Sequence, residues 1–142
     1  MNTCWRLVFS ISVLLLDAAI PDGAAAIDMC RGGDRAARKV TCVVDGDTVW
    51  VDGVKMRLLD IDAPEMHGQC QAETQRANEA ADRLMTLMDS GFAIEDSGQK
   101  DRTSDRRALV RVRLGNGQDA GAMLMREGLA QPWPNKGNVW CE

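Results

Sequence analysis

The sequence predicts an α+β fold that is mainly β, a small closed sheet capped by two helices, and three observations lead to this prediction. Short segments with alternating apolar residues lie on both sides of one longer segment with helical periodicity. Dipeptides that favour tight turns separate the first of these segments. The chain has 142 residues, of which 45% are hydrophobic and 27% are charged. Such a length and composition are typical of one globular domain with one core.

The N-terminal region has the features of a signal peptide covering residues 1–26. Arg6 supplies a positive charge, residues 7–16 form an apolar run, and three alanines at 24–26 provide an A-x-A-type cleavage site. The apolar run is too short to span a bilayer. A membrane anchor and a buried N-terminal helix are the alternatives. We expect a secreted or periplasmic protein with no membrane association after cleavage.

The charge of the mature chain restricts how it can act on nucleic acid. Removal of residues 1–26 would leave 16 Lys and Arg against 19 Asp and Glu. This acidic balance is a poor match for a protein that holds nucleic acid through its overall charge. Any chemistry on phosphates must therefore come from a focused site with a bound cation.

Four cysteines remain after cleavage, an even number in a small exported domain, and they indicate two disulfides. Of the three possible pairings we expect Cys30–Cys42, which would tie the N-terminal leader to the first strand. The second pair is then Cys70–Cys141, which would fasten the chain end. Zinc is the competing interpretation, but the sequence has no C-x-x-C pair and a single histidine.

The remaining elements follow from residue 39, after a polar leader segment at 27–38. The domain at 39–142 should begin with three strands separated by Asp-Gly turns, and Pro64 should end the third. A helix follows, because apolar residues between 77 and 88 form one stripe and Gly91 can cap its end. Two more strands, a loop between them, a short helix and a C-terminal tail without periodicity complete the chain. We expect strands at 40–44, 48–51, 54–61, 92–96 and 108–114, a loop at 97–105 and the short helix from about 119 to 128.

The residues able to do chemistry are carboxylates at strand ends. The motif D-G-D-T contains Asp45 and Asp47, and the motif D-I-D-A-P-E contains Asp60, Asp62 and Glu65. Oxygen-only ligand sets favour hard cations such as Ca²⁺ or Mg²⁺. The alternatives are a hairpin turn with solvated carboxylates and an edge strand with one surface salt bridge. The sequence contains no nucleophile elbow, no Walker loop and no H-E-x-x-H motif.

The spacing of three motifs resembles the staphylococcal nuclease-like (thermonuclease) family. They are D-G-D-T at 45–48, R-L-L-x-x-D-x-P-E at 57–65 and R-x-L at 107–109. The similarity runs from about residue 40 to about residue 130. The resemblance implies a five-stranded OB-type barrel with two packed helices, which agrees with the order of elements above.

The resemblance also implies a metal site and three catalytic residues. Asp47, Asp62 and the backbone carbonyl of Ala63 would hold Ca²⁺, which we favour over Mg²⁺. Glu65 would orient or deprotonate the attacking water. The remaining two residues, which would bind the phosphate and stabilise its transition state, are Arg57 and Arg107. The division of roles is coherent, because phosphodiester hydrolysis concentrates negative charge on the phosphoryl oxygens.

One loop departs from the family pattern. The usual D-[RK]-Y-G-R run before the last strand is replaced by T-S-D-R-R at 103–107, so the tyrosine and the glycine are absent. Arg106 competes with Arg107 for the catalytic role. We prefer Arg107 because it lies two residues before Leu109, as in the family. The family's third, C-terminal helix is replaced by a tail with Trp and Pro residues.

These observations lead to one hypothesis and two rivals. The leading hypothesis is a secreted, monomeric Ca²⁺-dependent endonuclease that hydrolyses phosphodiester bonds of DNA, RNA or both with little sequence specificity. The first rival is a catalytically silent OB-fold module that binds nucleic acid or oligosaccharide. The second is a disulfide-bonded structural domain whose carboxylates bind Ca²⁺ only for stability.

Overall fold

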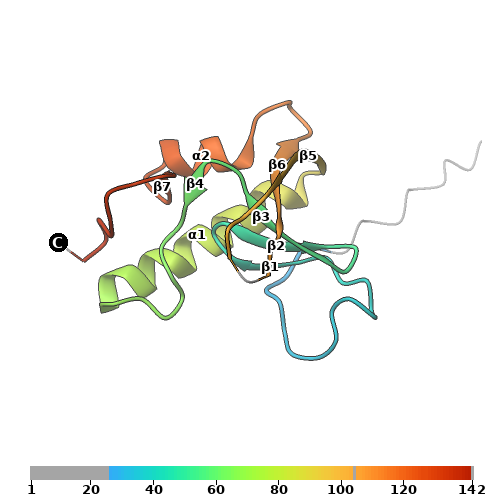
Figure 1. Ribbon diagram of the computed structural model, residues 1–142, viewed down its shortest axis with the longest axis horizontal. Helices are drawn as coiled ribbons and strands as arrows, with labels where there is room; N and C mark the ends of the chain where they lie inside the picture. Colours follow the sequence, from blue (N-terminus) through green and yellow to red (C-terminus); the bar gives the residue numbers. More distant parts are fainter. Residues whose placement is uncertain (1–25, 104, 142) are drawn as a thin grey trace, which may run out of the picture.

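A computed structural model describes residues 26–103 and 105–141, so residues 1–25 of the predicted signal peptide lie outside the described chain. A five-stranded sheet has the order β1-β2-β3-β6-β5, and a small second sheet pairs β4 with β7 (Figure 1). The prediction of an α+β, mainly β fold with five strands in the main sheet and two helices is confirmed for this part of the chain. The strands are β1 (Cys42–Asp45), β2 (Thr48–Val51), β3 (Val54–Leu58), β4 (Ile61–Asp62), β5 (Phe92–Lys100), β6 (Ala108–Leu114) and β7 (Gln131–Pro132). The helices are α1 (Gln71–Asp89) and α2 (Ala120–Arg126).

Two tight turns build the first half of the sheet, because β1, β2 and β3 pair antiparallel in sequence order. The chain then leaves the sheet, passes through β4, α1 and β5, and returns as β6, which pairs parallel to β3. This crossover puts Leu109 of β6 opposite Arg57 of β3, while Thr48 of β2 lies opposite Arg57 on the other side. The starts of β2 and β6 and the end of β3 therefore meet at one place.

Helix α1 packs on the sheet through the apolar stripe predicted from the sequence. The Cys70 Sγ caps its start by accepting a hydrogen bond from the Glu73 N–H at 3.4 Å. Gly91, with φ 97°, ends it, and the Gly91 N–H donates to the Met88 carbonyl at 3.0 Å. The fully buried members of the core come mainly from β1, β2, β3, β4, β6 and both helices, and include Val43, Val49, Leu58, Ile61, Leu84, Val112 and Leu124.

Three of the predicted elements differ from the structure for a clear local reason, and the first strand also begins at Cys42 rather than at residue 40. The third strand ends at Leu58 rather than residue 61, because Asp60 adopts a left-handed backbone (φ 64°) and turns the chain into the separate strand β4. Strand β5 extends to Lys100, past an irregularity in its pairing with β6, into the segment expected to be a loop. The aperiodic tail contributes β7, which pairs with β4. A two-residue strand leaves no periodicity in a sequence.

Both expected disulfides are present, Cys30–Cys42 and Cys70–Cys141. The first fixes the leader against the sheet, where the Cys30 N–H also donates to the Val43 carbonyl at 2.7 Å. The leader begins with a second attachment, since the Ile27 N–H donates to Asp89 Oδ1 at 2.6 Å. The second disulfide brings the C-terminal end to the start of α1 (Figure 1). None of the helices in the described residues is long and apolar enough to cross a membrane.

Candidate active site

The D-G-D turn between β1 and β2 is pressed against helix α1 and against residue 63. A Cβ atom on Gly46 would lie 2.7 Å from the Ala80 Cβ and 2.8 Å from the Ala63 Cβ, so only glycine fits. This close approach brings Asp47 to the backbone of Ala63, whose N–H donates to Asp47 Oδ2 at 3.1 Å. The side chain of Asp47 is almost fully buried. The two acidic motifs of the sequence therefore meet at the Asp47 carboxylate.

Arg57 joins the two motifs a second time. Its Nη2 atom lies 3.0 Å from Asp47 Oδ2 and 3.2 Å from Asp62 Oδ1. Because one nitrogen contacts both carboxylates, the expected metal ligands Asp47 and Asp62 lie side by side. Asp45, at the start of the turn, accepts a hydrogen bond from the Asp47 N–H at 3.0 Å and adds another negative charge nearby.

The pKa of Asp47 indicates that its charged form is disfavoured at this buried position, even beside Arg57. Burial and the neighbouring Asp45 raise the pKa of Asp47 from 3.8 to about 7, against the opposing effects of Arg57 and of hydrogen bonds from Ala63 and Thr48. A divalent cation would reverse this balance, since it favours the ionised carboxylate. An oxygen-only donor set with excess charge fits a hard cation such as Ca²⁺.

This raised pKa predicts how an Asp47→Asn variant should behave without metal. The charged form of Asp47 is disfavoured in the fold, so its contribution to stability is most favourable below pH 3.8 and is lost as the pH rises towards 7. In chelator, Asp47→Asn should therefore raise the melting temperature at pH 8 and leave it nearly unchanged at pH 4. Thermal unfolding at the two pH values checks this, and a variant destabilised at pH 8 would contradict it.

Glu65 lies on the loop between β4 and α1, close to the same cluster. Its side chain is exposed, yet local desolvation and the charges of Asp47 and Asp62 raise its pKa, while Arg57 lowers it. The Glu65 N–H donates to Glu73 Oε1 at 3.3 Å, which attaches this loop to helix α1. A carboxylate of raised pKa beside a cation site and open to solvent is suited to accept a proton from water.

Arg107 reaches the cluster from the start of β6. Its Nη1 atom donates to Thr48 Oγ1 at 3.2 Å, and the Thr48 hydroxyl donates to Asp47 Oδ1 at 2.9 Å. Asp101 holds the other side of the guanidinium, with Oδ2 at 2.6 Å from Arg107 Nε. Arg106 is exposed, with a left-handed backbone (φ 45°). The structure thus brings Arg107 to Asp47 through Thr48.

Two buried carboxylates of this region were missed by the sequence analysis. Burial alone would raise the pKa of Asp101, but hydrogen bonds from Thr103 and Arg107 and the charge of Arg107 bring it below its usual value. Burial would likewise raise the pKa of Glu73, but hydrogen bonds from the Gln69 N–H, the Asn138 amide and the Glu65 N–H lower it. Neither residue belongs to a motif, and their burial could not be read from the sequence.

Glu73 also lies beside the disulfide of Cys70 and Cys141, and the three side chains come within 4.8 Å of one another. Cysteine binds a metal as a free thiolate. The two sulfur atoms are bonded to each other here, so the group is a structural network rather than a metal site.

A cleft of about 580 Å³ opens beside the carboxylates. Its lining includes the expected site residues Arg57 and Asp62, together with Lys100, Arg102 and the exposed Trp133. Basic side chains and an exposed aromatic ring are the groups that single-stranded nucleic acid contacts. A larger hollow of about 860 Å³, between the leader, β2, β3 and β5, is mostly apolar and none of the expected site residues lines it.

Comparison with known families assigns the chain to one class. The model of the family described as "Staphylococcal nuclease homologue" matches residues 55–138, which is more than half of the chain. The protein belongs to this family of staphylococcal nuclease homologues. Domains of this family act on nucleic acids and typically depend on Ca²⁺. No protein matched the chain in a search of the curated proteins.

Proposed function

We propose that the protein is a secreted or periplasmic Ca²⁺-dependent endonuclease that hydrolyses phosphodiester bonds of DNA, RNA or both with little sequence specificity. One observation carries the proposal. Asp47, Asp62, Arg57 and Arg107, which come from separate strands or strand ends, form one connected network with Glu65 beside it. A purely structural domain has no need for a buried carboxylate that is disfavoured in its charged form.

In the proposed reaction, Asp47, Asp62 and the carbonyl of Ala63 would hold Ca²⁺, which supplies positive charge for the phosphoryl oxygens. Glu65 accepts a proton from the water molecule whose oxygen attacks phosphorus. The bond between phosphorus and the leaving ester oxygen breaks, and the departing alkoxide takes a proton from solvent water. Arg57 and Arg107 donate hydrogen bonds to the phosphoryl oxygens as negative charge builds up there. Arginine suits this role because its guanidinium donates in a planar, two-pronged geometry and stays charged at all working pH values.

The test is a degradation assay on plasmid DNA and on RNA with Ca²⁺, with Mg²⁺ and with excess chelator. Cleavage should require Ca²⁺ and stop in chelator, and Asp47→Ala or Asp62→Ala should abolish Ca²⁺ binding measured by calorimetry. Asp82→Ala is a matched control, since Asp82 lies on the exposed face of α1. Cleavage that continues undiminished in chelator would rule out this mechanism.

A catalytically silent module is the second candidate, and the ion pairs favour it. Arg57 is engaged by Asp47 and Asp62, and Arg107 by Asp101, so both arginines have carboxylate partners before any phosphate arrives. Such a module would bind oligonucleotides without cleaving them. Binding of a labelled oligonucleotide that remains intact with Ca²⁺ would support this candidate against the endonuclease.

A further inference from the structure

The segment that follows α2 contacts one of the proposed metal ligands directly. The side-chain amides of Gln131 and Asn135 both donate to Asp62 Oδ2, at 3.1 and 2.8 Å. The backbone of Gly137 orients these amides, because its N–H donates to Asn135 Oδ1 at 3.0 Å and its carbonyl accepts from Gln131 Nε2 at 3.2 Å. Arg57 holds the other oxygen of Asp62. Both oxygens of Asp62 are thus fixed by neighbouring donors.

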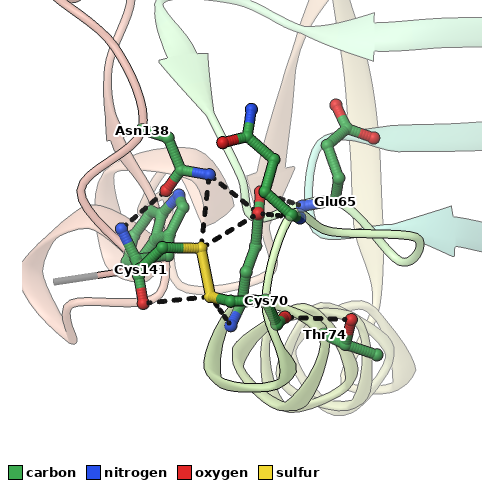
Figure 2. The surroundings of a disulfide bond; sticks show 8 residues. Glu65, Cys70, Thr74, Asn138 and Cys141 are labelled. Atoms are coloured by element: carbon green, nitrogen blue, oxygen red, sulfur yellow. Dashed lines mark hydrogen bonds between the residues drawn. A yellow bond between two sulfur atoms is a disulfide. The ribbon is translucent and has the colours of Figure 1, made fainter.

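The same segment reaches the loop of Glu65 at its other end. The Asn138 amide donates to Glu73 Oε2 at 2.7 Å, and Glu73 accepts the backbone N–H groups of Glu65 and Gln69 at 3.3 and 2.7 Å. Figure 2 shows Asn138 beside the disulfide, while the side chain of Glu65 extends away from it. The disulfide of Cys141 fixes the end of the segment at the start of α1.

We infer that residues 131–141 form a C-terminal clamp that positions Asp62 and Glu65. In the proposed function, Asp62 is a metal ligand and Glu65 is the base. This inference rests on that proposed function. Donors that hold a ligating carboxylate fix its orientation, and their loss typically weakens metal binding 10- to 100-fold, as an order of magnitude. Gln131, Asn135 and Asn138 are therefore positioning residues.

The clamp is held by polar contacts and a disulfide more than by apolar burial. Trp133 is 54% exposed and Val139 is 51% exposed, and both prolines of the segment are exposed. A segment that only completed the core would bury such side chains. Its amide groups are instead aimed at the carboxylates of Asp62 and Glu73.

Calorimetric titration with Ca²⁺ tests the Asp62 end of the clamp. Asn135→Ala and Gln131→Ala should each weaken Ca²⁺ binding by about 10-fold. Lys136→Ala is the control, because Lys136 lies on the same segment with an exposed side chain, and it should bind as the wild type does. Wild-type affinity in both amide variants overturns the inference. A wild type that neither binds Ca²⁺ nor cleaves nucleic acid overturns the proposed function with it.

Amide hydrogen exchange in the metal-free protein tests the Glu65 end without any activity measurement. Asn138→Ala should speed exchange of the Glu65 and Gln69 N–H groups, whose acceptor Glu73 loses its orienting partner, and leave β6 unchanged. The variant should also lower kcat with little effect on KM. Unchanged protection at Glu65 and Gln69 would contradict the role assigned to Asn138.

A separate contact joins the start of the described chain, at Ile27, to the end of helix α1, at Asp89. Asp89 is the last residue of α1, where the helix carries partial negative charge, and the last turn contains no basic residue. Within the described residues no ion pair involves Asp89, and its Oδ1 atom accepts the Ile27 N–H at 2.6 Å. The predicted signal peptide ends one residue earlier. We propose that cleavage after Ala26 creates an α-ammonium group at Ile27 that binds Asp89.

N-terminal sequencing of the exported protein should give Ile27 as the first residue. A double-mutant cycle then compares the mature protein with a form extended by Ala26, each with Asp89 or with Asp89→Asn. The extension should lower the melting temperature by a few degrees with Asp89 and have no effect with Asn. A different N-terminus, or the same decrease in both backgrounds, would overturn this inference.

Discussion

Glu65→Gln should lower kcat on DNA or RNA by roughly 10²- to 10⁴-fold and leave KM nearly unchanged. The amide cannot accept the proton from water, but it keeps the size and the position of the side chain. The raised pKa of Glu65 adds a second expectation for the wild type. The base must be deprotonated to act, so activity should increase with pH through the pKa of Glu65 in the Ca²⁺-bound enzyme, which the cation should hold below its raised metal-free value.

Steady-state kinetics across pH measures both effects. Glu79→Gln is the matched control, since Glu79 lies on the exposed face of α1 and pairs with Arg76 there. A variant at Glu65 that keeps near-wild-type kcat would remove this residue from the proton transfer. The clamp would then position a loop without catalytic purpose.

Arg107→Lys should lower kcat/KM by roughly 10²- to 10³-fold, because lysine keeps the charge but cannot donate in the planar geometry of a guanidinium. Arg107→Ala should be equally inactive and less stable as well. It leaves the buried carboxylate of Asp101 without its charged partner, a change that typically costs about 3–5 kcal/mol.

Arg106→Ala is the comparison that decides between the neighbouring arginines. The Arg106 side chain is exposed, so its removal should change activity by only a few-fold. Activity assays on the three variants, with unfolding curves to separate stability from catalysis, measure the difference. Greater sensitivity at Arg106 would show that the catalytic arginine was assigned one residue too late.

Much of the fold could be predicted because its signals are local. The second and fifth predicted strands, at 48–51 and 108–114, have the same bounds in the structure. The apolar stripe at 77–88 lies on α1 and faces the hydrophobic core. Alternation and helical periodicity depend only on neighbouring residues. The boundary at Asp60 was missed, because nothing in the apolar pattern of 54–61 reveals a left-handed residue.

The site, too, has a part that local motifs predict and a part that they do not. Asp47, Asp62, Glu65 and Arg57 were predicted because they lie in two short motifs. The amide side chains that hold Asp62 and Glu73 come from far along the chain and from no motif. Asn135 lies 73 residues from Asp62 and Asn138 lies 65 residues from Glu73, so only the pairing of β4 with β7 and the second disulfide bring them together.

The order in which the chain is synthesised gives the clamp a further consequence. Residues 131–141 are made after the carboxylates and arginines of the proposed site, and a disulfide, a bond that forms readily only in an oxidising compartment, fastens their end. A nascent or reduced chain would carry the carboxylates and arginines without the groups that orient them. With the proposed endonuclease activity, the protein would thus stay latent beside the genome of the cell that makes it. Its full activity would begin only after export and oxidation.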